Sequence, residues 1–377
     1  MKSEHSPYLP NPTQHLLMKA ALLKEEKATQ AWQAWKSTVD LDDIDYASLR
    51  MLPMLYQNLK QHNVPDDPYL QRMKGIYRLA WVQNQLLFRR LSEINSLFQR
   101  YGIKFISLKG AALVFGYYHD YGVRPMHDLD LLVKPDQLDA VIRTLTGNGW
   151  RQQHQYPKAL LKYRRELVFV NQAEQEIDVH WHLLREWCQP QQDAEVWANT
   201  ATSSMNDSPA TTLNPTFTLL HLCGHGYQWS DLPSFIWIAD ARKVITAAPD
   251  KVDWEKLLVA ATGYDLTLAL HNLLVYLSDE LDTPIPSLVL EQFIQCSPSA
   301  RDIAIHDTRA ENPNTVSRVL RKHWLYYASV KQREGNRKNL FGFLYYFCLH
   351  FKDFWGLKRW WYVPFYSLKV IRQHYKN

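Results

Sequence analysis

Two short runs of sequence decide the fold of this chain: KFISLKGAAL at residues 104–113 and RPMHDLDLLV at residues 124–133. The first run predicts a strand over residues 104–108 that stops at Gly110 and turns into a helix over residues 111–118. After a turn-rich segment, the second run predicts a strand over residues 129–133. Strand, helix and strand therefore follow one another closely in the middle of the chain.

The next segments extend this pattern into a small sheet. Pro135 is well placed to open a helix whose apolar face continues to Leu145. Residues 167–170 and 177–181 predict a hairpin around the turn at residues 171–175. The order strand, helix, strand, helix, hairpin describes a small mixed sheet with helices on one side.

Helical periodicity fills the rest of the chain. Apolar residues recur at helical spacing over residues 13–100, with a break at residues 63–68. From residue 186 onward helices are expected again, at residues 217–225, 235–247, 254–261 and 266–277. We therefore expect an α+β protein with a helical region at 1–100, a sheet-containing core at 101–185 and a second helical region at 186–377.

Two carboxylates share one face of the second strand. Asp128 and Asp130 are two residues apart, so both side chains leave the same face. They repel each other unless a cation or free water lies between them. Asp178, on the later strand, joins them if that strand pairs beside the first. Because Mg²⁺ or Mn²⁺ prefers such oxygen ligands, the pattern predicts a metal centre of Asp128, Asp130 and Asp178; a solvated strand end is the alternative.

The strand-to-helix turn upstream is typical of a phosphate-binding site. Lys109, Gly110 and Ala111 lie at the start of the expected helix, where backbone N–H groups favour anions. Gly110 lets the backbone approach a triphosphate closely, and Arg124 supplies a second cation. We place these four residues in the nucleotide site, although Lys109 and Arg124 have an alternative interpretation as exposed surface residues.

Four histidines require a choice between metal binding and packing. His180 and His182 share the face of Asp178 if the strand holds. We place His180 in the wall of the nucleotide site and expect His182 to shape the site without binding metal. His221 and His225 are four residues apart on an expected helix, a spacing that can bind zinc, but no Glu follows His221. A packed helix that faces the metal centre is the favoured interpretation.

These residues resemble a known superfamily. LKGAA at residues 108–112, followed by RPMHDLDLLV, is similar to the DNA polymerase β-type nucleotidyltransferases, and within them to a bacterial group of uncharacterised nucleotidyltransferases. Residues 177–181, 221–225, 237–241 and 252–254 also resemble this group, so the resemblance covers about residues 104–260. It implies an Asp-x-Asp pair, a third Asp on a later strand and a nucleotide substrate. Ala111 departs from the usual Gly or Ser, and His127 from a small residue.

Composition limits the class of protein and its cellular location. Of the 377 residues, 46% are hydrophobic, which is enough for a sizeable core, and the net charge of +5 is too small to imply nucleic-acid binding by itself. The four scattered cysteines form no CxxC pair, and no signal-peptide core or apolar run of about 18 residues is present. We expect a cytoplasmic protein without a membrane-spanning segment.

The end of the chain, residues 334–377, is aromatic and basic. Such a segment could lie on a membrane surface or stack on nucleic-acid bases. Two helices that pack their rings into the core are the favoured interpretation. Lys358 and Arg359 mark a weak peripheral surface for a partner.

The sequence thus predicts a magnesium-dependent nucleotidyltransferase. It would move a nucleoside monophosphate from an NTP such as ATP to an acceptor, with pyrophosphate leaving. No motif encodes the acceptor, which could be a small molecule, a glycan precursor, a peptide or an RNA. Two alternatives keep the same fold: a toxin-like enzyme that modifies tRNA or protein, and a non-catalytic nucleotide-binding or scaffold protein.

Overall fold

The computed structural model describes most of the chain. The described residues are 8–62, 64, 68–156, 161, 164–184, 190–205, 208–227, 234–311, 315–333, 345, 347–349, 351–352 and 355–367. Part of the break expected at residues 63–68 and part of the aromatic end of the chain lie outside the described residues. Within the described residues, no helix is both long and apolar enough to cross a bilayer.

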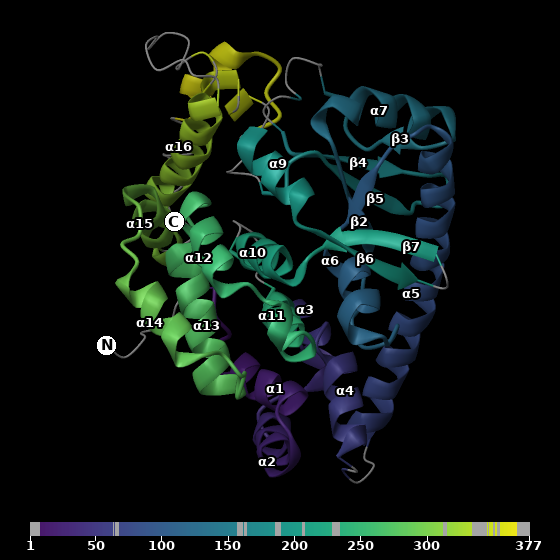
Figure 1. The fold of residues 1–377 in the computed structure, drawn as a ribbon, viewed down its shortest axis with the longest axis vertical. Coiled ribbons are helices and arrows are strands. Elements are labelled where there is room, and N and C mark those ends of the chain that lie inside the picture. The colour runs from purple at the N-terminus through teal and green to yellow at the C-terminus, as the bar shows by residue number, and fades with distance from the viewer. Residues whose placement is uncertain are drawn as a thin grey trace.

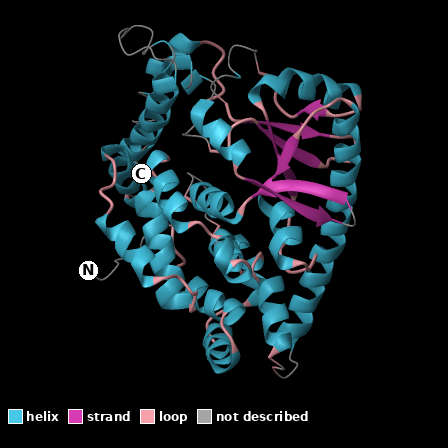
Figure 2. Ribbon diagram, in the orientation of Figure 1, coloured by secondary structure: helices cyan, strands magenta, loops and turns pink. Residues whose placement is uncertain are grey.

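One mixed sheet with helices around it forms the centre of the fold (Figures 1 and 2). The described strands are ordered β3-β4-β5-β2-β1-β7-β6, in which β2–β5 and β1–β7 are parallel pairs and the other neighbours are antiparallel. Their bounds are β1 Phe105–Ser107, β2 Asp128–Val133, β3 Arg151–Gln152, β4 Glu166–Val170, β5 Glu176–His180, β6 Thr200–Met205 and β7 Ser208–Leu213. The α+β class and the mixed sheet are confirmed.

Alternation along β2 separates two cores. Leu129, Leu131 and Val133 pack into a cluster with apolar residues of α5 (Pro68–Arg100) and α7 (Leu138–Gly147). Leu132 points to the opposite face and joins the core of the C-terminal helices. Helices therefore cover both faces of the sheet, whereas the sequence led us to expect them on one side. The second layer comes from helices far along the chain, which no local pattern links to β2.

The helical flanks share a single core. The N-terminal helices are α1 Pro12–Leu22, α2 Glu25–Lys36, α3 Tyr46–Leu49 and α4 Leu52–Gln61, followed by α5. Leu17 and Met18 of α1 are fully buried in the same cluster as Leu273 of α13. The helices after the sheet core are α9 Pro190–Ala198, α10 Pro215–Gly226, α11 Ile236–Ala247, α12 Trp254–Gly263, α13 Thr267–Leu281, α14 Ser287–Gln295, α15 Ala300–Ala310 and α16 Val316–Arg333.

Most of the expected elements lie where the sequence placed them. Helices α10 to α13 match the four helices expected after residue 215, and β4 and β5 flank the turn at residues 171–175. The expectation of helices alone after residue 186 is wrong at β6 and β7, which add two strands to the sheet edge beside β1. How the chain divides into domains remains a prediction.

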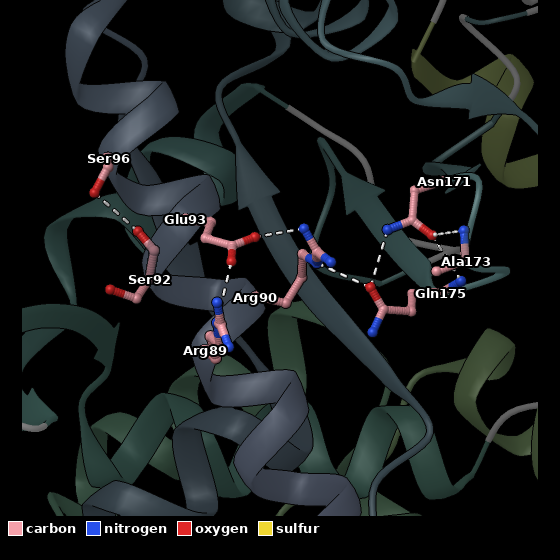
Figure 3. A network of polar contacts seen from close by, with 8 residues as sticks. All are labelled: Arg89, Arg90, Ser92, Glu93, Ser96, Asn171, Ala173 and Gln175. Carbon is pink, nitrogen blue, oxygen red and sulfur yellow. Dashed lines mark hydrogen bonds and ion pairs between the residues drawn. The ribbon is translucent and has the colours of Figure 1, made fainter.

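The hairpin of β4 and β5 is held against α5. Arg90 of α5 donates from Nε to Oε1 of Gln175 at 2.9 Å and also pairs with Glu93 (Figure 3). Within the turn, Oδ1 of Asn171 accepts from the backbone N–H groups of Ala173 and Gln175 at 2.9 and 3.0 Å. An Asn whose side chain accepts hydrogen bonds from the backbone of its own turn fixes the loop length and therefore the register of the two strands.

Candidate active site

The register between β2 and β5 assembles a row of carboxylates. These parallel strands pair Asp128 with Glu176, Asp130 with Asp178 and Leu132 with His180. Residues opposite each other in neighbouring strands point to the same face, so Asp130 and Asp178 lie side by side, and Asp128 lies two residues away along β2. The pairing that the sequence left open, that of the later strand beside the first, is confirmed.

Asp130 is the most enclosed carboxylate of the row. It is 3% exposed and accepts from Nζ of Lys109 at 2.5 Å, and Nε2 of His180 lies 2.9 Å from the same oxygen, Oδ1. Burial works to raise its pKa, but the Lys109 ammonium and the His180 hydrogen bond together lower the pKa of Asp130 below its usual range. Asp130 is therefore ionised at any physiological pH.

The two neighbouring carboxylates behave in the opposite way. Burial, followed by the charge of Asp130, raises the pKa of Asp128 to about 6. Burial, followed by the charges of Asp130 and Asp128, raises the pKa of Asp178 to about 8. The protein alone therefore compensates Asp130 but leaves Asp128 and Asp178 poorly compensated, and pKa values that are spread in this way are common at functional sites.

His180 connects the carboxylate row to β4. Its ring is 1% exposed, and while Nε2 meets Asp130, Nδ1 lies 3.3 Å from Oε2 of Glu166. Burial lowers the pKa of His180. A neutral imidazole between two carboxylates can fix the orientation of Asp130, and it also adds a nitrogen to the set of possible metal ligands.

The donor set fits a divalent cation. One ligand atom each from Asp130, Asp178 and His180 lies within 4.8 Å of the other two. Oxygen ligands suit Mg²⁺ or Mn²⁺, and the imidazole nitrogen is also acceptable to Mn²⁺. A cation in this position would offset the burial and the mutual repulsion that raise the pKa values of Asp178 and Asp128. The residues are therefore compatible with a metal centre.

The turn between β1 and α6 (Lys109–Leu113) approaches the carboxylates from the neighbouring strand. The backbone N–H of Leu108 donates to the carbonyl of Asp130 at 3.0 Å, and Lys109 has a left-handed backbone with φ of 46°. This conformation is uncommon for a residue with a side chain, and here it accompanies the contact between the Lys109 ammonium and Asp130. Lys109 is thus directed at the carboxylates.

Gly110 and Ala111 lie deeper than the expected phosphate-binding turn suggested. A Cβ on Gly110 would meet Cγ and Sδ of Met126 at 2.7 Å and Nη1 of Arg124 at 3.3 Å, so packing against Met126 already requires a small residue. Ala111 is 2% exposed and belongs to the core on the α5 side of the sheet. After α6 the chain forms a π-helical turn, Val114–Tyr118, in place of a regular helix to residue 118.

Arg124 has a buried partner on a distant helix, a contact that no local sequence pattern predicts. Its Nη2 lies 2.9 Å from Oδ2 of Asp240 in α11, and Tyr118 donates from Oη to Oδ1 of the same carboxylate at 2.9 Å. Asp240 is fully buried and Arg124 is 7% exposed. Sequence reasoning missed this contact of Asp240 with Arg124 and Tyr118, because Asp240 lies more than one hundred residues further along the chain.

The N-terminal helices also reach the edge of the site. Tyr46 lies with its hydroxyl 2.9 Å from Nε2 of His127, the residue that precedes Asp128. Arg50 donates from Nη2 to the carbonyl of Pro125 at 3.4 Å, and its charge acts to lower the pKa of Asp128. The helical region before residue 100, which contained no recognisable motif, thus supplies side chains beside the carboxylates.

The remaining histidines occupy two different settings. Nδ1 of His182 lies 2.9 Å from Oδ2 of Asp193 in α9, a pairing that ties the end of the sheet to that helix. His221 and His225 of α10 have ring centroids 6.1 Å apart. Burial, followed by the charge of Lys109, lowers the pKa of both well below the usual value. Both are therefore neutral and close to the candidate site.

A sequence model of a family described as uncharacterised nucleotidyltransferase matches residues 46–281. The chain belongs to this family. The match covers more than half of the chain and extends beyond residues 104–260 on both sides, so it includes the N-terminal helices that carry Tyr46 and Arg50. Membership of the family makes the protein a nucleotidyltransferase.

Solved structures give more distant similarities. A lincomycin-bound lincosamide antibiotic adenylyltransferase, LnuA, is 14% identical, with 42% of this chain and 96% of that chain covered and a TM-score of 0.31. The antibiotic-resistance factor ANT(2'')-Ia is 12% identical, with coverage of 50% and 98% and a TM-score of 0.37. An antigenic nucleotidyltransferase-like protein from Paracoccidioides brasiliensis is 18% identical, with coverage of 57% and 96% and a TM-score of 0.34. No curated protein matches the chain.

Proposed function

We propose that this nucleotidyltransferase moves a nucleoside monophosphate from an NTP to an acceptor in a reaction that depends on Mg²⁺ or Mn²⁺. Asp128, Asp130 and Asp178 would hold the metal, and Lys109 with the N-terminal end of α6 would contact phosphate. The pairing of Asp130 with Asp178 across β2 and β5 carries the proposal, because it brings the third carboxylate to the face of β2 that Asp128 and Asp130 share. ATP is the first nucleotide to test.

The carboxylates have distinct parts in the reaction. The acceptor group attacks the α-phosphorus, a new bond to phosphorus forms, the bond to the β-phosphate oxygen breaks, and pyrophosphate leaves. A bound divalent cation supplies charge neutralisation at the triphosphate. Asp178, as an ionised carboxylate beside the bound metal, would accept the proton that the acceptor loses. Asp130 stays ionised and keeps His180 and Lys109 in place.

Lys109 contributes positive charge near the carboxylates. Its ammonium contacts Asp130, while the side chain remains 14% exposed. A triphosphate that brings its own cation would compete for Asp130, and the Lys109 ammonium could then pair with a phosphate oxygen within the reach of its flexible side chain. Arg124 is less suited to this part, because Asp240 already binds its guanidinium.

The position of the transferred label tests the proposal. We expect the full chain, incubated with Mg²⁺ and cell extract, to transfer label from α-labelled NTP and not from γ-labelled NTP. Asp128→Asn is expected to abolish the transfer, whereas Asp136→Asn, which changes an exposed carboxylate outside the row, is expected to leave it unchanged. Transfer from the γ-position would replace nucleotidyl transfer with phosphoryl transfer.

We also propose a cytoplasmic location. Among the described residues, Cys223, Cys296 and Cys348 are free thiols, as is usual in a reducing compartment. Cell fractionation with the full chain would check this, and recovery in an oxidising extracytoplasmic fraction would contradict it.

A further inference from the structure

The excess of positive over negative charge lies at the C-terminal end of the chain. Residues 337–377 contain eight Lys and Arg residues and one Asp, whereas the whole chain has a net charge of +5. The first 336 residues therefore carry a small net negative charge. The same 41 residues contain 14 aromatic side chains. A cationic and aromatic segment on an otherwise acidic protein requires a separate explanation from the nucleotide site.

Four aromatic rings in the described part of this segment are exposed. Trp360, Trp361, Tyr362 and Phe365 are 37%, 44%, 46% and 71% exposed, and Lys358, Arg359 and Pro364 beside them are also exposed. We call residues 358–365, apart from the buried Val363, the aromatic-basic surface. The preference for rings packed in the core, expected from the sequence, is wrong for these four side chains.

Packing beneath this surface holds it in shape. Val363 is 4% exposed and Phe351 is 1% exposed. The ring of Trp355 lies 4.5 Å from that of Phe351 and 5.2 Å from that of Tyr366. The exposed rings therefore project from an anchored base. In Figure 1 the yellow C-terminal segments lie at the end of the molecule opposite α1 and α2.

We propose that the aromatic-basic surface binds the surface of an anionic lipid bilayer. Trp and Tyr favour the boundary between headgroups and acyl chains, where their rings are dehydrated while their polar atoms stay wet. The adjacent Lys358 and Arg359 would contact anionic headgroups. Phe365, the most exposed of the four rings, would enter the acyl region. The protein would then lie on the membrane surface.

Ring geometry favours lipid over single-stranded nucleic acid. Successive bases stack on open, roughly parallel ring faces. Here the Trp360 ring is at 83° to that of Trp361 and at 80° to that of Tyr345, and the Arg359 guanidinium lies 5.1 Å from the Trp361 ring centroid. The rings therefore present edges in several directions and offer no continuous platform for bases. Insertion into a fluid lipid interface has no such geometric requirement.

Vesicle binding of the full chain tests the proposal. We expect cosedimentation with vesicles of equimolar phosphatidylcholine and phosphatidylglycerol, none with phosphatidylcholine alone, and weaker binding as salt rises. Lys358→Glu with Arg359→Glu is expected to lower the partition constant at least about tenfold. Trp361→Ala with Phe365→Ala is expected to lower it roughly tenfold through lost apolar contact. Circular dichroism would establish that each variant is folded.

Matched variants on α5 show whether any change in charge or in exposed apolar area would lower vesicle binding equally. Arg89→Glu with Arg100→Glu makes the same change in net charge, and Leu79→Ala with Trp81→Ala removes exposed apolar area elsewhere. Both control pairs are expected to bind like the unchanged protein. Failure to bind the anionic vesicles, or an equal loss in the controls, would overturn the proposal. Binding of a single-stranded RNA oligonucleotide instead, lost in the same C-terminal variants, would put RNA in place of lipid.

Discussion

At the scale of single residues, the three carboxylates of the site differ in how far neighbouring groups compensate their charges. Asp130 has two partners, Lys109 and His180, and stays ionised. The pKa values of Asp128 and Asp178 rise because burial and the charges of neighbouring carboxylates outweigh the nearby cations. The types and spacing of these acids were predictable from the sequence. Their different degrees of compensation were not, because Lys109 approaches from another strand and His180 acts across the β2–β5 pairing.

Asp178→Asn is expected to stabilise the metal-free protein at high pH. An Asp whose pKa is higher in the folded than in the unfolded state binds its proton more tightly when folded, so the stability of the unchanged protein falls as pH rises from about 4 to about 8. In EDTA at pH 8 we expect the variant to gain about 1 to 3 kcal/mol in the free energy of unfolding, and nothing near pH 4. Chemical denaturation at both pH values checks this, and an equal gain at both would contradict it.

Asp240→Asn is expected to destabilise the fold more than it changes nucleotide affinity. The substitution leaves the buried guanidinium of Arg124 without its counter-charge, which costs about 3 to 5 kcal/mol. Denaturant unfolding measures the loss, and Arg124→Met combined with Asp240→Leu should recover part of it. Unchanged stability together with a raised KM for NTP would instead indicate that Arg124 binds phosphate, as the sequence suggested.

At the scale of elements, prediction succeeded where the sequence carries a local signal. Asn171 accepts hydrogen bonds within its own turn, so the hairpin and its length could be predicted. In β2, apolar residues at alternate positions marked the strand. The strands β6 and β7 have the sequences TATSSM and SPATTL, which are small, polar and without strong periodicity. β7 pairs with β1, and β6 pairs with β7. The pairing with β1 depends on the rest of the sheet, so no local pattern predicts it.

Gly110→Ala tests the junction of β1 and α6. The added Cβ would meet the end of the Met126 side chain, so we expect a loss of about 1 to 3 kcal/mol in the free energy of unfolding. In a Met126→Ala background the same substitution should cost at least about 1 kcal/mol less, because the clash is gone. The comparison is a double-mutant cycle by urea unfolding. Strictly additive losses would mean that Met126 does not explain the glycine.

At the scale of the whole molecule, N- and C-terminal helices enclose the same core. The sequence predicted one helical region before the sheet-containing core along the chain and another after it, but no sequence pattern indicated that α1 packs in one cluster with α13. Such contacts join segments more than two hundred residues apart and follow from three-dimensional shape alone.

Leu17→Ala is therefore expected to weaken the C-terminal helices. Leu17 is fully buried in the shared core, and its truncation should cost about 2 to 5 kcal/mol. Hydrogen exchange should become faster in α13 as well as in α1. The exposed Leu79→Ala serves as a control with a change within about 0.5 kcal/mol. Faster exchange confined to the first hundred residues would show instead that the N-terminal region is an independent unit.

The central claim is that the row of Asp128, Asp130 and Asp178 forms a metal-dependent nucleotide site. Calorimetric titration of the full chain with ATP and the other NTPs, with Mg²⁺ and with EDTA, tests this most directly. We predict saturable binding of at least one NTP with Mg²⁺, at least about tenfold weaker binding in EDTA, and the same loss in Asp130→Asn but not in Asp136→Asn. Absence of binding for every NTP in the presence of either Mg²⁺ or Mn²⁺ would contradict the claim.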